Sequence, residues 1–128
     1  MLLLIAGVFL ALHGLIHLMG FVVPWKLATI EDLPYTTTLL NGSWDVGTTG
    51  IRVLGLLWLL AALGFVVAGT GLITRQKWWW TASLVVAVLS LVVTALQWPD
   101  AQFGTYIDAL VLVALLIVRR RITSLASP

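Results

Sequence analysis

The chain has no cysteine and very few charged residues. Of its 128 residues, 61% are apolar and only 9% are charged, whereas about 25% of the residues in a soluble domain are charged. Without cysteine, the chain can form no disulfide, thiol nucleophile, Cys-ligated zinc site or iron–sulfur cluster. So few charges cannot cover a water-facing surface. The composition therefore indicates a membrane protein, with residues 1–128 forming a single transmembrane domain.

Four long apolar runs make up most of the sequence. A helix needs ~20 residues to cross the hydrocarbon core of a bilayer, which is about 30 Å thick. The first run has no basic start and is longer than the apolar core of a signal peptide, so we expect it to be retained. The sequence thus predicts an all-α fold, an integral membrane bundle of four transmembrane helices. The predicted spans are residues 2–23, 51–73, 79–98 and 103–118.

Lysine and arginine predict how the bundle is oriented, because they concentrate in short cytoplasmic loops. Arg75 and Lys77 lie between the second and third spans, and three arginines follow the fourth span at positions 119–121. Both termini are therefore predicted to be cytoplasmic, with the long 24–50 loop on the extracytoplasmic side. We expect a multi-pass protein of the plasma (inner) membrane, and the compact chain favours a bacterial one.

The 24–50 loop contains the pattern of a short β-hairpin. Residues 36–40 and 43–46 flank Asn41-Gly42. Asn-Gly favours the two positive-φ positions of a type I′ turn. The sequence therefore predicts a hairpin with its turn at Asn41-Gly42.

Two of the spans carry polar stripes at helical spacing. His13 and His17 are four residues apart and share one face of the first span. A neighbouring stripe of Gly7, Ala11 and Gly14 predicts a close helix–helix contact. In the third span, small and polar residues share a face that we expect to turn inward, although ordinary helix packing explains such a stripe too. They are Ser83, Ala87, Ser90, Thr94 and Gln97.

The ionisable residues within the spans all fall in the half nearer the 24–50 loop. Such residues are costly in a bilayer and usually face the bundle interior in pairs. We predict an outward-opening polar pocket there, with an Arg52–Asp108 ion pair and His17 within reach of it. The predicted pocket residues are His13, His17, Arg52, Ser90, Thr94, Gln97 and Asp108.

Several chemistries fit these residues. His13, His17 and Asp108 could together hold Zn²⁺ or Cu²⁺. Two histidines on one helix face point the same way, so they cannot both be axial ligands of one haem. No serine stands beside a histidine in a specific motif, so no catalytic residue is assigned and enzymatic activity is left open. Proton relay, ligand binding and plain helix packing also remain open for the His pair.

The first span also resembles a known family. Residues 7–15, continuing to Gly20-Phe21, resemble the opening helix of DoxX-like membrane proteins, and residues 69–75 resemble the junction that precedes their third helix. The resemblance implies a compact four-helix bundle linked to quinone-connected respiratory complexes. The chain departs from the family pattern at His17, where a basic residue is common, and at Arg52, where an acidic one is common.

Three functions are therefore expected as alternatives. The favoured one is an accessory or scaffold subunit of a membrane respiratory or redox complex, with a membrane-protein partner or a second copy of the chain. The second is a binder or transporter of a small ligand, such as a lipid, in the polar pocket. The third is a DoxX-like quinone-linked oxidoreductase component. The bilayer is the expected surrounding, and the small net charge of +2 leads us to expect no nucleic-acid partner.

Overall fold

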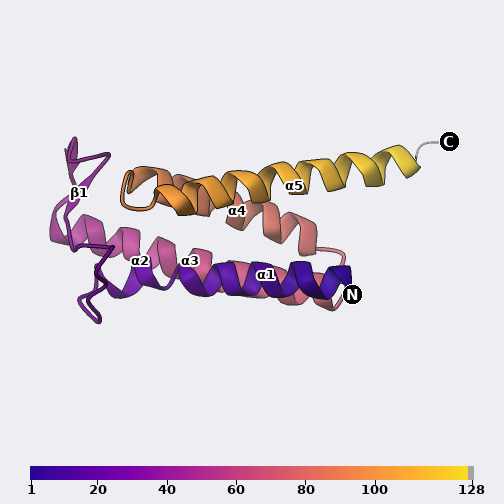
Figure 1. Cartoon of the computed structure of the whole chain (residues 1–128), viewed down its shortest axis with the longest axis horizontal. Coiled ribbons are helices and arrows are strands. Elements are labelled where there is room, and N and C mark those ends of the chain that lie inside the picture. Colours follow the sequence, from indigo (N-terminus) through magenta and orange to yellow (C-terminus); the bar gives the residue numbers. More distant parts are fainter. Residues whose placement is uncertain (127–128) are drawn as a thin grey trace.

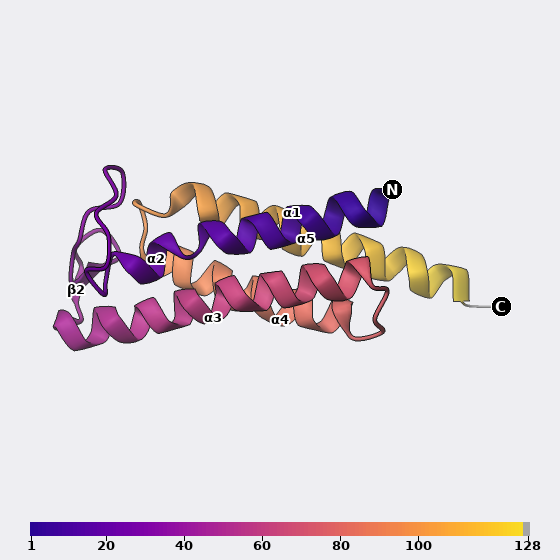
Figure 2. The same ribbon diagram turned by 90° about the horizontal axis from the view of Figure 1, so that it is seen from below.

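The computed structural model describes residues 1–126 and consists mainly of helices. The first and the last of these residues lie at one end of an elongated bundle, which we call the terminal end, and the two short strands lie at the other, the loop end (Figures 1 and 2). Neighbouring helices pack in the order α1, α3, α4, α5. The elements are α1 (Leu2–Ile16), α2 (Met19–Val22), β1 (Thr38–Leu39), β2 (Trp44–Asp45), α3 (Gly47–Ile73), α4 (Trp79–Leu96) and α5 (Gln102–Ala126).

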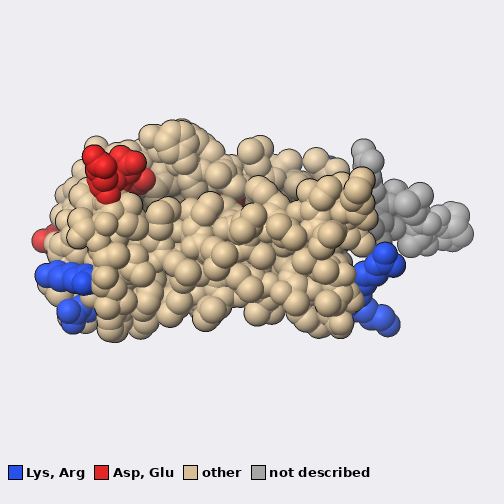
Figure 3. Space-filling model, turned by 60° about the horizontal axis from the view of Figure 1, so that its bottom comes forward, with Lys and Arg blue, Asp and Glu red and all other residues tan. Residues whose placement is uncertain are grey.

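Four helical segments of the described chain are long and apolar enough to cross a membrane, which confirms the predicted number of spans. They are Leu2–Val22, Gly47–Ile73, Trp79–Leu96 and Gln102–Arg120. On the face drawn in Figure 3, the charged side chains gather at the two ends of the bundle, and the surface between the ends carries almost none. Length, composition and this distribution together indicate a multi-pass membrane protein.

Two of the spans differ from those predicted. The first span is not one continuous α-helix, because a turn at His17-Leu18 separates α1 from α2. The fourth helix continues well beyond residue 118, and α5 reaches past the other helices at the terminal end (Figure 1). Its last turns contain the arginine run, which ends the apolar stretch without ending the helix. Apolar length therefore predicted the span but not the whole helix.

The hairpin forms, but with shorter strands than predicted. Thr38 pairs with Asp45 and Leu39 pairs with Trp44. Asn41 and Gly42 both have positive φ, as the Asn-Gly pair predicts. The backbone N–H of Asn41 donates to the carbonyl of Trp98 at 2.9 Å, which fastens the turn to the end of α4. The tip of the hairpin thus lies over the α4–α5 connection.

The start of α3 is joined to the hairpin by a side chain. The backbone N–H of Gly47 donates to Asp45 Oδ1 at 2.9 Å. This bond, with a second one from Thr37, lowers the pKa of Asp45 below its ordinary value. The carboxylate thereby satisfies one of the N–H groups that a helix N-terminus leaves unpaired.

Small residues bring α1 and α3 into backbone contact. A Cβ atom added to Gly7 would lie 2.7 Å from the carbonyl oxygen of Gly69, and one added to Gly14 would lie 2.7 Å from that of Ala62. The predicted small-residue stripe is therefore a helix contact. Because lipid tails are as apolar as the side chains, close packing of this kind is a main source of helix association in membranes.

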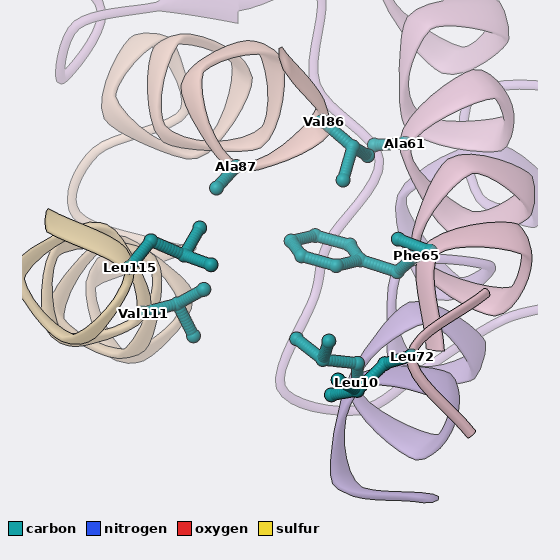
Figure 4. Packing of buried hydrophobic residues seen from close by; sticks show 9 residues of the cluster. Leu10, Ala61, Phe65, Leu72, Val86, Ala87, Val111 and Leu115 are labelled. Carbon is teal, nitrogen blue, oxygen red and sulfur yellow. The ribbon is translucent and has the colours of Figure 1, made fainter. Parts of the chain in front are cut away.

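An apolar core fills the bundle toward the terminal end. Phe65 is fully buried and points from α3 toward α4 and α5 (Figure 4). It is surrounded by side chains from all four long helices: Leu10, Ala61, Ala68, Leu72, Val86, Ala87, Val111 and Leu115. On the loop-end side of this core lie His13 of α1 and His17, which directly follows α1.

We expect Gly69→Val to separate α1 from α3, because the added methyl groups meet the backbone of Gly7. Overpacking of this kind costs roughly 1–3 kcal/mol. The free energy of unfolding in detergent measures the effect, and Val67→Ile, at an exposed position of α3, is the matched control. Equal stability of the two variants would show that the close contact is absent.

Candidate functional site

The turn between α1 and α2 orients His17. At this turn the backbone N–H of His17 bonds to the carbonyl of Gly14, three residues back, as in a 3₁₀-helix. The carbonyl of His13, which a continuous α-helix would pair with that N–H, instead accepts the side-chain Nδ1–H of His17 at 2.9 Å. A carbonyl can only accept, so Nδ1 carries a proton and Nε2 points into the bundle.

Asp108 joins α1, α4 and α5. His13 Nε2 donates to Asp108 Oδ1 at 2.8 Å. On the other oxygen, Ser90 Oγ donates at 2.6 Å and Thr94 Oγ1 lies at 3.2 Å. His17 Nε2 is bonded to Ser90 Oγ and lies 3.9 Å from Asp108 Oδ2. We call these five residues the Asp108 cluster.

Aromatic rings shield the Asp108 cluster from solvent on the side that faces α3. Asp108 is 0% exposed, and His13 and His17 are 4% and 2% exposed. The ring of Phe65 lies 4.8 Å from that of His13, and the ring of Trp58 lies 5.1 Å from that of His17, centroid to centroid. A carboxyl group in such surroundings is tolerated only when its oxygens are hydrogen-bonded, and here both oxygens are.

The hydrogen bonds between His17, Ser90 and Asp108 require one proton more than the hydroxyl of Ser90 can supply. Two bonds connect His17 Nε2, Ser90 Oγ and Asp108 Oδ2 in a row, and each bond needs a proton. Ser90 supplies one. The other is on His17, as an imidazolium that donates to Ser90 while Ser90 donates to the Asp108 carboxylate, or on Asp108, as a carboxylic acid that donates to Ser90 while Ser90 donates to the His17 imidazole. In both forms His17 and Asp108 share one proton through Ser90.

A groove opens beside the cluster, between the α1–α2 segment and the start of α5. It has a volume of about 300 Å³, and His13 and His17 form part of its lining. Its sides include Ile16 of α1 and Phe103 and Ile107 of α5, all exposed and apolar. The cavity therefore differs from the predicted polar pocket, because its walls are mainly apolar and its polar groups lie at the base and the rim.

Five of the seven predicted pocket residues come together in the Asp108 cluster: His13, His17, Ser90, Thr94 and Asp108.

The Arg52–Asp108 ion pair was a wrong prediction, since Asp108 is paired with His13 instead. Arg52 is exposed near the loop end of α3, with its guanidinium 5.7 Å from the ring centre of Trp25. The prediction rested on the similar depth of the two residues in the membrane. It did not consider the direction in which each residue faces around its helix.

Gln97 stands apart from the cluster and has another partner. Trp58 Nε1 donates to Gln97 Oε1 at 2.5 Å, which links α3 to the end of α4. The sequence did not reveal this bond, although Trp58 lies well inside the predicted span 51–73. A buried indole N–H needs an acceptor, and this need was the signal that could have identified it.

Two serines on the same face of α4 allow a matched test of the cluster. Both are fully buried, but Ser90 bonds to His17 and Asp108, whereas Ser83 Oγ has no hydrogen-bond partner in the described residues. We expect Ser90→Ala to lower the free energy of unfolding by about 1–3 kcal/mol, because it leaves buried polar groups unpaired. Ser83→Ala should leave stability unchanged or raise it. The opposite order, measured in detergent, would contradict the network.

Comparison of the chain with protein-family models, curated proteins and solved structures finds no match. The cluster and the groove therefore supply the argument for function.

Proposed function

We propose that the protein binds the polar end of a lipophilic molecule in the groove between α1 and α5. The observation that carries this proposal is the position of the two histidines. They belong to a buried hydrogen-bonded cluster and also line a cavity whose walls are apolar. Apolar walls with a few placed polar groups are typical of small-molecule sites.

The size and opening of the groove favour a ring or a headgroup. Its volume of about 300 Å³ is at the lower end of the range for ligand pockets. Ile16, Phe103 and Ile107 are exposed at the groove, on helical segments that are long and apolar enough to cross a membrane. A molecule dissolved in the bilayer can thus enter sideways, with its tail still among the lipids.

The hydrogen-bonding state of His13 favours a ligand that donates. Its Nε2–H is given to Asp108, so Nδ1 of the neutral ring is an acceptor. Within the described residues this Nδ1 has no hydrogen-bond partner, and it is not among the fully buried unpaired atoms. A hydroxyl group, as in a quinol or a lipid alcohol, is the chemistry that suits it.

The orientation and location that we propose come from the charges. Arg75, Lys77, Arg119 and Arg120 belong to the terminal end, whereas Lys26 and Arg52 are the basic residues of the loop end. By the positive-inside rule, the terminal end is cytoplasmic and the groove lies in the outer half of the membrane. We propose a plasma membrane of a bacterial cell as the location.

The other expected functions stay predictions. An accessory subunit of a redox complex would need a membrane-protein partner or a second copy of the chain. The DoxX-like resemblance is supported only by the sequence motifs. A quinol is the ligand that both this resemblance and the geometry of the groove favour. We favour binding over catalysis, because the hydroxyl of Ser90, which is bonded to His17 and Asp108, is fully buried and does not line the groove.

Histidine NMR tests the proposal, because the chain contains two histidines. We expect a short-tailed benzoquinol, added under anaerobic conditions to ¹⁵N-histidine protein in detergent, to shift the Nδ1 resonance of His13 saturably. Ile107→Trp, which fills the groove, should abolish the shift. Leu110→Trp, on an exposed part of α5 outside the groove, should retain it.

The probes also separate the ligand classes. A saturable shift with a long-chain alcohol but not with the benzoquinol would assign the groove to lipid alcohols. No saturable shift with either probe, or equal shifts in the two tryptophan variants, would contradict binding in this groove.

A further inference from the structure

We propose that the Asp108 cluster is also a binding site for one divalent transition-metal ion, with Zn²⁺ as the best fit. The ligands would be His13 Nε2, His17 Nε2 and one carboxylate oxygen of Asp108. This proposal does not rest on a ligand in the groove, because all three donor groups belong to the buried cluster.

The donor atoms already converge. One ligand atom from each of the three residues can be chosen so that all lie within 4.8 Å of one another. The His13 and His17 Nε2 atoms lie 2.8 and 3.9 Å from oxygens of Asp108. Tetrahedral zinc with bonds of about 2.0–2.1 Å places its ligand atoms ~3.4 Å apart. The two observed distances end on different oxygens of Asp108, Oδ1 for His13 and Oδ2 for His17, so ligation through one oxygen requires the side chains to rotate about the metal position.

The surroundings of the donors are those of a metal ligand set. His17 Nδ1–H donates to the His13 carbonyl, the type of bond that fixes the ring and directs Nε2 at a metal. Ser90 and Thr94 bond to Oδ2 of Asp108 and hold the carboxylate in turn. These contacts make the turn between α1 and α2 and the polar stripe of α4 part of the site.

The donor types and the charge favour a particular class of ion. Two imidazoles and one carboxylate suit zinc and neighbouring metals, whereas Ca²⁺ and Mg²⁺ prefer oxygen ligands alone. A metal ion would take the place of the proton shared by His17 and Asp108, and His13 would carry its own proton on Nδ1 instead of Nε2. The positive charge beside Asp108, which we had predicted to come from Arg52, would then come from the ion.

The groove supplies the fourth coordination position. Three protein ligands leave tetrahedral zinc with one open position. His13 and His17 form the part of the groove lining that belongs to the cluster, so the open position faces this cavity. Water or the hydroxyl of a bound molecule can occupy it.

Cobalt spectroscopy of the full chain in detergent tests the site, after removal of any purification tag and of metal by a chelator. We expect Co²⁺ to give the visible d–d absorption of a tetrahedral site, saturating at one ion per chain and abolished by Zn²⁺. His17→Gln and His13→Gln should weaken binding more than ~100-fold. The paired control is Asp32→Asn with Asp100→Asn, which removes the carboxylates at the groove rim and should leave the titration unchanged.

A second measurement keeps the test valid if the glutamine variants fold poorly. In the unaltered protein, Co²⁺ should broaden both Nε2 resonances of ¹⁵N-histidine at one equivalent. Absence of the d–d band at saturating Co²⁺, broadening of only one histidine, or loss of the titration in the rim variant would each overturn the metal site. A benzoquinol shift in metal-free protein would in that case still support the groove proposal.

Discussion

The structure depends on a carboxyl group that lies inside the bundle without contact with solvent. Asp108 of α5 is held by hydrogen-bond donors from two other helices, α1 and α4. In a bilayer no water is present to replace a lost partner, so such a group must be satisfied within the protein. The Asp108 cluster therefore constrains how α5 sits against the rest of the bundle, where its own packing neighbour is α4.

The same constraint explains features that otherwise look unrelated. The turn after α1 frees the carbonyl of His13 for the ring of His17. The close approach of α1 and α3 at their glycines brings Phe65 against His13, which seals one side of the cluster. The other side remains open as the groove between α1 and α5, and this asymmetry is the basis of the binding that we propose.

Much of this arrangement could be predicted from the sequence, because hydropathy and helical periodicity are local properties. They gave the four spans, the shared face of His13 and His17, and the inward face of α4 with Ser90 and Thr94. The partner of Asp108 could not be predicted in the same way. Arg52 and Asp108 lie in the same half of the membrane, so depth alone allowed them to pair. The rotation of α3 about its axis, which depends on packing, directs Arg52 outward. The groove also escaped prediction, because it results from the gap between two helices that are distant in the sequence.

A double-mutant cycle between His13 and Asp108 tests the central claim most directly. The free energy of unfolding in detergent would be measured for the unaltered protein, His13→Ala, Asp108→Ala and the double variant. Interhelical hydrogen bonds in membranes average about 0.6 kcal/mol in such cycles. The account predicts a coupling above ~1 kcal/mol, because the bond is buried and charge-assisted. A coupling of zero would contradict it, since His13 would then contribute nothing to holding Asp108.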